Sequence, residues 1–419
     1  MKDTALFAQL LGLSPPWQVT EVTPNLDTKE STLRITWPDG KKAPCPDCQE
    51  DCGIYDHREE RAWRHLDTMQ FKTLLVSEVP RVNCKAHGVK SMKVPWADLK
   101  GRFTMLFERF AIDVLLSASS KAKAAALLGL SWDEVHHIQE RAVKRGLSRR
   151  SLDEIKHLGI DEKSFLKGQS YASVLYDLDG SRVIEVKQER TQEAATAFLG
   201  TLPETVRENI EAVAVDMWDP FLAAIKTTLP DAEIVHDKYH LVSYLTKAVD
   251  AVRRMEHKTL KLDGQEDVLK GTRYTWLRNP ENWTEKDEAT FKELKNKGLK
   301  VARAWAIKET FMDIWEYTYE QSARTFFAKW YWWATHSRLA PIIKVAKTMK
   351  RHLDNILTYL RHRVTNAKAE GFNSKIQAIK SAARGFLRNF AKYRVAILGS
   401  SDLSVGPMGT QCHSAMHSS

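Results

Sequence analysis

The chain has 419 residues, of which 43% are hydrophobic, so it can form about two to four domains and is not a disordered protein. Its formal net charge of +10 and pI of about 9.2 favour a polyanionic partner, nucleic acid or an anionic membrane surface, over a basic protein without one. We expect no transmembrane helix, because there is no apolar run of about 18 residues, and no secretory signal. Five cysteines are too few for a disulfide framework, which fits the cytoplasm.

The first 100 residues are expected to form a β-rich domain. Residues 1–30 have the pattern of a short helix followed by a linker. Two later segments, Thr32–Trp37 and Lys72–Val82, alternate in polarity or contain β-branched residues, which is typical of strands. Four of the five cysteines lie between residues 45 and 84, and this clustering indicates a metal site.

Two short Cys/His motifs in this domain have the spacing of zinc ligands. Cys45 and Cys48 are three residues apart, and so are Cys84 and His87. One tight turn can present each pair to the same ion, and thiolate and imidazole ligands suit Zn²⁺ in a tetrahedral site. Four protein ligands leave no open position, so we expect a structural role. Cys52 is a rival ligand, and unrelated thiols are the alternative interpretation.

Residues 101–150 are predicted to be a helix-turn-helix DNA-binding domain. Helices are expected over 103–117, 121–128 and 132–145, with Ser131 as the cap of the last one. An ordinary helical hairpin between two domains is the alternative. The last helix would present to a groove His136, Gln139, Glu140 and Lys144. The phosphate backbone would be held by Lys144, Arg145, Arg149 and Arg150.

Residues 151–250 are expected to form the first part of an RNase H-like core. Asp179-Gly180 joins two of the first three strands and is a hairpin signal, whereas the strand–helix–strand units that follow imply parallel pairing. The resulting mixed sheet is predicted from strands at 157–165, 171–178, 182–187, 212–216 and 233–236, with helices at 191–199 and 219–228.

The rest of the chain is predicted to be helical. Residues 251–350 form a Trp-rich insertion, and residues 351–398 return to the core as one long helix or two, before a disordered tail at 399–419. The aromatic segment Phe326–Trp333 could stack on an unpaired base, although a helical core or dimer contact is the plainer interpretation. The predicted fold class is multidomain α+β: a zinc-binding β-rich N-terminal domain (1–100), a helix-turn-helix, and an RNase H-like mixed α/β catalytic core interrupted by an all-helical insertion.

Three acidic residues have the placement of a metal-dependent nuclease site. Asp161 lies on the first core strand, Asp216 ends a buried apolar strand, and Glu370 lies on a late helix. A carboxylate at the end of a buried strand is costly unless it is paired or bound to metal, and a divalent cation offsets the repulsion between two such groups. Together they would form a two-metal site for Mg²⁺, for which Mn²⁺ can substitute. The alternatives are strand-end or capping carboxylates and a solvated helix charge.

The helix around Glu370 carries a polar stripe in a basic field. Helical spacing aligns the candidate auxiliary residues Asn366 and Asn373 with Glu370. Between Arg361 and Arg394 there are nine Lys or Arg residues and one acid, Glu370. Contacts to DNA phosphates are expected in this region from Lys375, Lys380, Arg384 and Arg388.

Taken in order, these motifs resemble the ISL-three family of bacterial insertion-sequence transposases, over roughly residues 40–395. The resemblance is carried by Cys-Pro-Asp-Cys with Cys-Lys-Ala-His downstream, Gly-Leu-Ser-Trp, Gly-Ile-Asp-Glu, Val-Asp-Met and Ala-Glu-Gly-Phe-Asn. It implies a DDE triad at Asp161, Asp216 and Glu370, with a helical insertion before the glutamate. It also implies a near-site role for Asp237 or His240, although capping of the next helix is the alternative for the aspartate.

We therefore expect a DNA transposase that binds the terminal inverted repeats of an insertion sequence and catalyses metal-dependent cleavage and strand transfer on double-stranded DNA. Synapsis of two ends calls for a homodimer or a larger assembly, on the nucleoid and away from membranes. A non-catalytic zinc and helix-turn-helix regulator is the main alternative, although it would not need three metal-ready carboxylates. A junction resolvase fits less well, because the front domains favour specific duplex ends.

Overall fold

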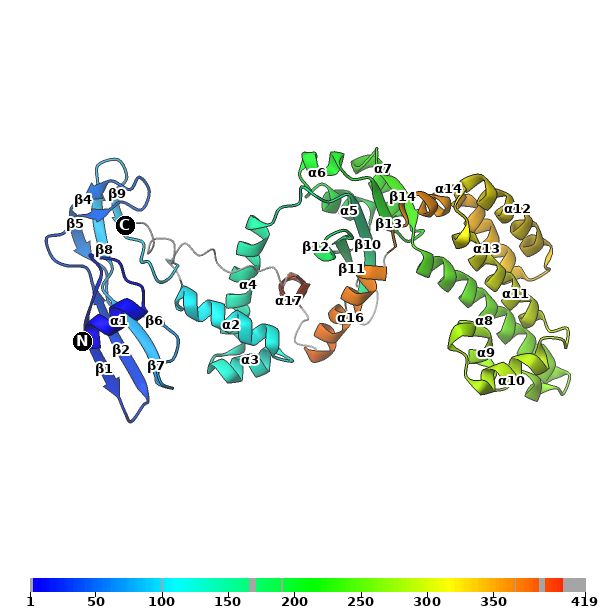
Figure 1. The fold of residues 1–419 in the computed structure, drawn as a ribbon, viewed down its shortest axis with the longest axis horizontal. Helices are drawn as coiled ribbons and strands as arrows, with labels where there is room; N and C mark the ends of the chain where they lie inside the picture. Colours follow the sequence, from blue (N-terminus) through cyan, green and yellow to red (C-terminus); the bar gives the residue numbers. More distant parts are fainter. Residues whose placement is uncertain are drawn as a thin grey trace. The chain divides into compact units, whose positions relative to one another are not determined.

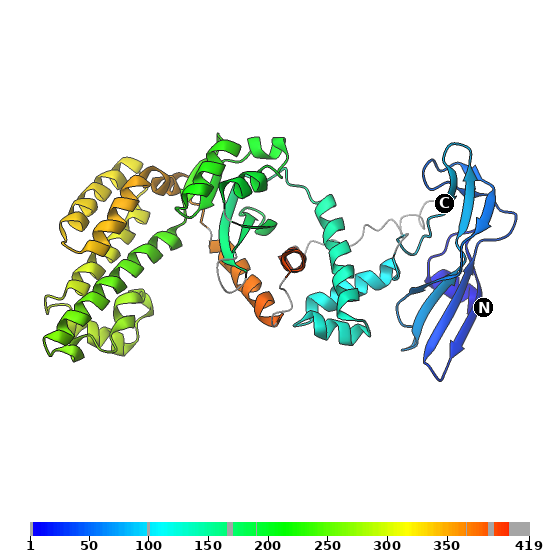
Figure 2. The same cartoon turned by 180° about the vertical axis from the view of Figure 1, so that it is seen from behind.

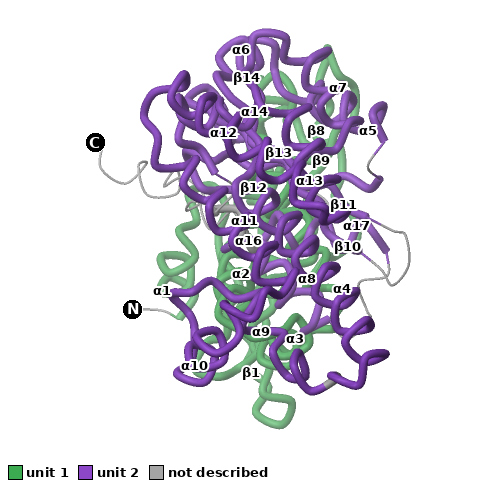
Figure 3. The backbone as a smooth tube through the Cα atoms, turned by 90° about the vertical axis from the view of Figure 1, so that its right-hand side faces the viewer, with its two compact units in different colours: residues 1–148, 403–419 green, residues 149–402 purple. Residues whose placement is uncertain are grey.

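The computed structural model describes residues 3–98, 101–165, 171–189, 191–365, 367–383 and 389–401. The chain separates into two compact units, one built on residues 1–148 and the other on residues 149–402 (Figure 3). The first holds the β-rich and helix-turn-helix regions, and the second holds a mixed α/β core with many helices. This confirms the predicted multidomain α+β fold class. Among the described helices, none is long and apolar enough to span a membrane.

The β-rich region consists of two small sheets and a two-stranded ribbon. Helix α1 (Asp3–Leu10) precedes a four-stranded sheet of order β1-β2-β7-β6, which contains β1 (Gln18–Asn25), β2 (Glu30–Thr36), β6 (Arg61–Arg64) and β7 (Lys72–Ser77). The second sheet has the order β5-β8-β9 and contains β5 (Ile54–His57), β8 (Pro80–Cys84) and β9 (Gly88–Ser91). The ribbon pairs β3 (Ala43–Pro44) with β4 (Asp51–Cys52).

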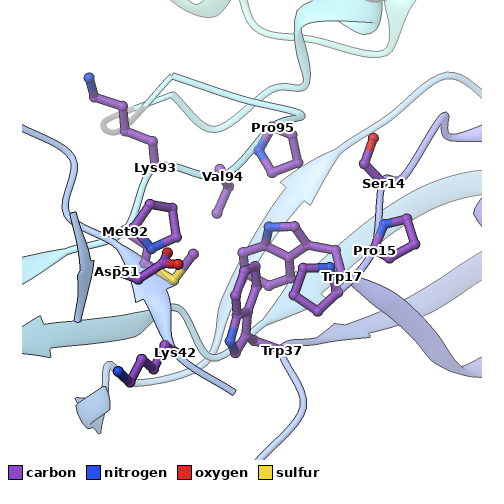
Figure 4. A pocket seen from close by; sticks show the side chains of 12 residues that line it. Ser14, Pro15, Trp17, Trp37, Lys42, Asp51, Met92, Lys93, Val94 and Pro95 are labelled. Atoms are coloured by element: carbon purple, nitrogen blue, oxygen red, sulfur yellow. The ribbon is translucent and has the colours of Figure 1, made fainter. Parts of the chain in front are cut away.

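Tryptophans form the centre of this region. Trp17 packs edge-on against Trp37 and Trp96, with ring centroids 5.2 and 5.0 Å apart, and Trp63 meets Trp96 at 5.6 Å. A pocket of about 530 Å³ opens beside Trp17, Trp37 and Met92 (Figure 4). Because each ring buries a large apolar area, a few of them hold together strands that are too short to be stable alone.

Two expectations for this region are wrong. The linker predicted within residues 1–30 contains β1, which pairs antiparallel with β2. The single strand expected over Lys72–Val82 is two strands in different sheets, β7 and β8, which are separated at Glu78 and Val79. A continuous ladder cannot run through this point, because β8 begins with Pro80, which has no N–H to donate.

Three helices follow, and local capping sets their ends. They are α2 (Met105–Ser117), α3 (Lys121–Leu128) and α4 (Trp132–Arg149). The Ser120 side chain caps α3, and Gly129 ends it with a left-handed φ of 63°. The Ser131 hydroxyl accepts from the Glu134 N–H at 3.2 Å, while the Glu134 carboxylate accepts from the Ser131 N–H at 2.9 Å. The three predicted helices are confirmed, and α4 continues four residues beyond its predicted end at 145.

The core of the second unit is a five-stranded mixed sheet of order β12-β11-β10-β13-β14 (Figure 1). Strands β10, β11 and β12 pair antiparallel, whereas β13 is parallel to both β10 and β14. Helices α5 and α7 share a buried apolar core with the strands. The elements lie within one residue of their predicted bounds, and only the short α6 (Glu204–Glu208) is additional. They are β10 (His157–Ser164), β11 (Tyr171–Asp177), β12 (Arg182–Gln188), α5 (Gln192–Leu199), β13 (Ala212–Val215), α7 (Asp219–Thr228) and β14 (Glu233–His236).

Helix α8 (Lys238–Leu262) leads from β14 into an all-helical region with its own core (Figures 1 and 2). The aromatic segment belongs to that core, since Phe327 and Trp330 are buried and the Trp330 Nε1–H donates to the Ile307 carbonyl at 2.8 Å. This burial fits the interpretation of the segment as part of a helical core. The helices are α9 (Arg273–Leu277), α10 (Glu285–Leu294), α11 (Lys300–Met312), α12 (Glu320–His336), α13 (Ala340–Arg351), α14 (Leu353–Leu357) and α15 (Tyr359–His362), with 3₁₀ turns η1 (Glu266–Val268), η2 (Pro280–Asn282) and η3 (Asp313–Glu316).

The chain returns to the core through α16 (Ala367–Ala382) and α17 (Phe390–Ser401). The prediction of one or two helices from residue 351 onward is wrong, because α14 and α15 precede them and Arg363, with a left-handed φ of 52°, ends α15. Arg394 of α17 pairs with Glu185 of β12 at 2.6 Å, which fixes α17 on the edge strand. From residue 402 onward, the predicted tail lies outside the described residues.

Candidate active site, zinc site and DNA-binding helices

The four predicted zinc ligands converge in the β-rich region. Cys45 and Cys48 lie between β3 and β4, Cys84 ends β8, and His87 lies in the turn before β9. The Cys84 Sγ lies 3.6 Å from both the Cys48 Sγ and the His87 Nδ1, and the Cys45 Sγ lies 3.7 Å from the same nitrogen. These separations suit four ligands of one tetrahedral zinc ion. Cys52 is not in this group, and its thiol donates to a backbone carbonyl at 3.3 Å.

Backbone N–H groups in the two turns favour the thiolate form of two of these cysteines. The N–H of Cys48 is the largest influence on the pKa of Cys45, which is lowered. Burial opposes ionisation of Cys84, but the N–H groups of Ala86 and His87 help to lower its pKa. Because zinc binds the thiolate, these N–H groups prepare Cys45 and Cys84 for the metal.

Helix α4 does not expose all of the side chains that were predicted to read DNA. His136 and Gln139 are 5% and 6% exposed, so neither faces a groove as predicted. They flank the apolar side of α4, which packs against α2 and α3, and the His136 Nδ1 lies 3.1 Å from the Lys121 Nζ. The side of α4 that is exposed carries His137, Glu140 and Lys144.

The arginines near the end of α4 are partly committed to the fold. Arg145 pairs with the buried Glu108 of α2 at 2.9 Å, and Arg150 donates to two backbone carbonyls of β12 at 3.1 and 2.9 Å. These two residues therefore have structural partners where phosphate contacts were predicted. Lys144 and Arg149 are exposed, as contacts to a DNA backbone require.

The register of two parallel strands brings Asp161 and Asp216 together. Gly159 of β10 lies opposite Ala214 of β13. Asp161 is two residues beyond Gly159, and Asp216 is two residues beyond Ala214, so both follow at the same level of the sheet. Asp161 is 8% exposed, which means that its carboxylate depends on the groups around it for charge stabilisation.

His240, in the first turn of α8, lies among three carboxylates. Its Nδ1 lies 3.3 Å from the Asp216 Oδ2, and its Nε2 lies 3.9 Å from both the Asp161 Oδ1 and the Asp237 Oδ2. Asp237 is 3% exposed and precedes α8, but its side chain makes no capping hydrogen bond to that helix. The near-site placement of Asp237 and His240 therefore fits the geometry better than a capping role.

Asp216 and His240 stabilise each other's charged forms. Burial alone would raise the pKa of Asp216, but hydrogen bonds from His240, a backbone N–H and Tyr244 lower it. Burial would lower the pKa of His240, but the neighbouring aspartates raise it. Burial and Asp216 raise the pKa of Tyr244 to about 12, and its hydroxyl donates to the Asp216 Oδ2 at 3.3 Å. The site concentrates negative charge, and its carboxylates favour the charged form of His240.

Asn373 of α16 joins its helix to the sheet at Asp161. The Asn373 Nδ2 donates to the Asp161 Oδ2 at 2.7 Å, and its Oδ1 accepts from the Tyr176 hydroxyl at 2.9 Å. Lys163 lies 2.9 Å from the same Asp161 oxygen. Sequence reasoning missed Tyr176, Lys163 and Tyr244. The alternation of β10 could have indicated Lys163, two residues after Asp161, whereas both tyrosines depend on tertiary packing.

Several predicted residues cannot be placed in the site. Glu370 lies in α16, three residues before Asn373, but its side chain is outside the described part of the structure. Asn366, Arg384 and Arg388 also lie outside the described residues.

Two predicted DNA contacts on α16 have different surroundings. The Lys380 Nζ donates to the Ser164 carbonyl at 2.7 Å, so it docks α16 on β10. Lys375 is exposed, with its Nζ 5.5 Å from the centre of the Phe372 ring. Of these two, Lys375 is placed on the surface in the way that a phosphate contact needs.

Comparison with known families gives three matches in the same order as the regions described above. Residues 41–87 match a zinc-finger of transposase IS204/IS1001/IS1096/IS1165, and residues 92–143 match a helix-turn-helix domain of transposase family ISL3. Residues 158–397 match the ISL3 transposase family itself. This last match covers more than half of the chain.

Two named relatives cover nearly the whole chain. The transposase for insertion sequence element IS1001 of Bordetella parapertussis is 27% identical, over 86% of this chain and 90% of the relative. The transposase for insertion sequence element IS1557 of Mycobacterium tuberculosis is 25% identical, over 95% of this chain and 96% of the relative. The Cys/His cluster, the three helices and the mixed sheet correspond in turn to the three matched regions, and the chain belongs to the ISL3 family of transposases.

Proposed function

We propose that this protein is a DDE transposase that cuts and joins DNA at the ends of an insertion sequence, with Asp161, Asp216 and Glu370 as catalytic carboxylates. The observation that carries the proposal is the register of β10 and β13, which sets Asp161 and Asp216 side by side next to His240. Position 370 lies one helical turn before Asn373, which contacts Asp161.

The carboxylates are suited to hold Mg²⁺, for which Mn²⁺ can substitute. Hard divalent cations prefer carboxylate oxygens, and the buried Asp161 and Asp237 and the half-buried Asp216 repel one another unless cations offset their charge. Bound cations would supply activation of a water or 3′-hydroxyl nucleophile and stabilisation of the leaving oxygen.

The chain's own side chains fix the two aspartates for this task. Asn373 and Lys163 hold the oxygen of Asp161 that faces α16, while Tyr244 and His240 hold an oxygen of Asp216. The lowered pKa of Asp216 keeps its carboxylate ionised at neutral pH. Ligands that are fixed and ionised in advance need no rearrangement when the DNA binds.

The first unit is proposed to recognise terminal inverted repeats. Its cluster of Cys45, Cys48, Cys84 and His87 holds a structural zinc ion, and its exposed Lys144 contacts phosphates, as does Arg149, the last residue of α4. Two ends must be held together for strand transfer, so the active form is a dimer or a larger assembly.

The test is cleavage of a labelled duplex that carries the element's own end, in Mg²⁺ and in Mn²⁺. We expect the wild-type protein to give specific 3′-hydroxyl ends. Asp216→Asn is expected to bind the duplex but to cleave it about a thousandfold more slowly, because a metal-binding oxygen contributes several kcal/mol to transition-state stabilisation.

Asp231→Asn is the matched control, because Asp231 is an exposed aspartate of the same unit, in the turn before β14. It should cleave like the wild-type protein. Equal cleavage by Asp216→Asn would contradict the assignment of the site. Tight binding without cleavage by the wild-type protein, in either metal, would favour the non-catalytic regulator.

A further inference from the structure

A second cluster of metal-type ligands lies at the opposite end of the sheet from Asp161 and Asp216. It contains His157, which begins β10, Glu211, which directly precedes β13, and His362, which ends α15. Strands β10 and β13 are parallel, so their first residues meet at one edge. A nitrogen of each imidazole and an oxygen of Glu211 lie within 4.8 Å of one another.

Each imidazole in this cluster is oriented by a carboxylate of its own. The His157 Nδ1 lies 2.8 Å from the Asp179 Oδ1, and the other Asp179 oxygen accepts from the His157 backbone N–H at 2.8 Å. The His362 Nε2 lies 2.6 Å from the Glu233 Oε2, while the Glu233 Oε1 pairs with Arg361 at 2.7 Å.

A carboxylate on one ring nitrogen fixes the tautomer and leaves the other nitrogen as a lone-pair donor. This is the usual arrangement around histidines that bind metal. The two rings meet edge to face, with centroids 5.8 Å apart, so the His157 and His362 ligands converge from two distant parts of the chain.

We propose that His157, Glu211 and His362 bind a divalent transition-metal ion of the zinc class, with a water molecule in the fourth position. Two imidazoles and one carboxylate are a ligand set that zinc accepts, whereas Mg²⁺ and Ca²⁺ prefer oxygen ligands alone. Zinc at about 2.1 Å from each ligand requires ligand atoms about 3.4 Å apart. Glu211 is exposed, so its side chain is free to rotate toward an ion held by the two rings.

The ion pair now made by Glu211 does not prevent this. Lys156 lies 2.8 Å from the Glu211 Oε1, but the two side chains are 62% and 48% exposed. An exposed pair of this kind contributes little to stability because solvent screens it, so a metal ion can displace the lysine.

The site would connect the sheet to the chain as it returns from the helical insertion. His362 is followed within five residues by α16, which carries Asn373 and Glu370. A metal ion shared by β10, the residue before β13 and α15 would hold the start of that return in place. This inference is independent of the proposed catalytic reaction, and its test measures bound metal.

The experiment uses the full-length Asp216→Asn protein as background, so that an intact catalytic site does not add to the metal count. Zinc per chain is measured by plasma emission after dialysis against buffered zinc. The background is expected to hold one more zinc equivalent than the same chain with His157→Gln and His362→Gln. His336→Gln is the control, because His336 is an exposed histidine of α12 outside the cluster, and it should keep the full count.

Asp179→Asn is a second variant that tests the site without removing any of its three ligands, in case the double histidine variant does not fold. Loss of the orienting carboxylate should weaken zinc binding by about 10- to 100-fold. Circular dichroism would check that each variant folds. Equal zinc content in all variants, unchanged affinity in Asp179→Asn, or an equal loss in His336→Gln would each overturn the proposal.

Discussion

At the scale of single residues, Asn373 is the side chain on which the geometry of Asp161 depends. It donates to Asp161 and accepts from Tyr176, so it links two strands and α16. A hydrogen bond to a charged group contributes about 1.5–3 kcal/mol, and Asn373→Ala should therefore reduce the cleavage rate by about 10- to 100-fold. Tyr176→Phe removes only the bond to the amide oxygen and should have a smaller effect. Single-turnover cleavage at saturating DNA measures both, and full activity of Asn373→Ala would exclude this role.

The His65 side chain predicts how the first unit responds to acid. It lies between β6 and α2, with its Nδ1 2.9 Å from the Thr104 Oγ1, and burial together with Arg64 lowers its pKa to about 4. The unfolded chain has a histidine pKa near 6.5, so it binds more protons than the folded unit between these values. His65 therefore does not reduce the free energy of unfolding of the first unit above about pH 6.5. As the pH drops toward 4, the free energy of unfolding falls by up to about 3 kcal/mol.

Urea unfolding at pH 7 and pH 5 checks this. His65→Gln should lose less stability on acidification than the wild-type protein, since it cannot take up the extra proton. His57→Gln, at an exposed histidine of β5, should behave like the wild-type protein. Three identical pH responses would show that His65 does not set this dependence.

At the scale of elements, one buried acid joins the first and last helices of the helix-turn-helix region. Glu108 of α2 is 3% exposed and pairs with Arg141 and Arg145 of α4 at 2.5 and 2.9 Å. Both arginines are about one third exposed, so solvent reduces the cost of breaking the pairs to about 2 kcal/mol. Glu108→Gln should lower the unfolding free energy of the first unit by that amount.

Denaturant unfolding would measure this change. Asp113→Asn, at an exposed acid of the same helix, should stay within about 0.5 kcal/mol of the wild-type protein. Equal stability of Glu108→Gln and the wild-type protein would mean that α2 and α4 are held together by apolar contacts alone.

The bounds of some elements follow from local sequence, whereas others depend on tertiary contacts. Helices with their own caps, such as α3 between Ser120 and Gly129, have bounds that local chemistry decides. Strand β1 has few apolar residues and depends on pairing with β2, so its own residues do not predict a strand. His136 and Gln139 lie beside the apolar side of α4, and their burial is decided by α2 and α3. Local signals predicted the elements, while the exposed side of a helix required tertiary structure.

The same limit applies to the candidate site. The juxtaposition of Asp161 and Asp216 could be predicted, because β10 and β13 are neighbouring parallel strands and carry the two residues at the same level of the sheet. The contacts of His240 and Tyr244 could not, because they depend on where α8 leaves the sheet.

At the scale of the whole molecule, separate cores predict separate unfolding steps. The first unit has a tryptophan-rich core and a helical one, and the second unit has cores of its own. Cys48→Ser removes a proposed zinc ligand and should lower the transition temperature of the first unit by about 10 °C or more. The transition temperature of the second unit should stay unchanged. Cys52→Ser is the matched control and should shift the first transition much less. A single transition, or equal shifts from the two variants, would contradict this organisation.

The helical insertion leaves and rejoins the core at one strand. Helix α8 starts directly after β14, and the returning chain meets β14 again where Asn355 approaches His236 at 3.4 Å and Arg361 pairs with Glu233 at 2.7 Å. A segment with neighbouring ends can be lengthened, shortened or exchanged without rerouting the strands around it. The number of residues between Asp216 and Glu370 is therefore free to drift during evolution, so a search for remote relatives should align the two sides of this segment separately and leave its length open.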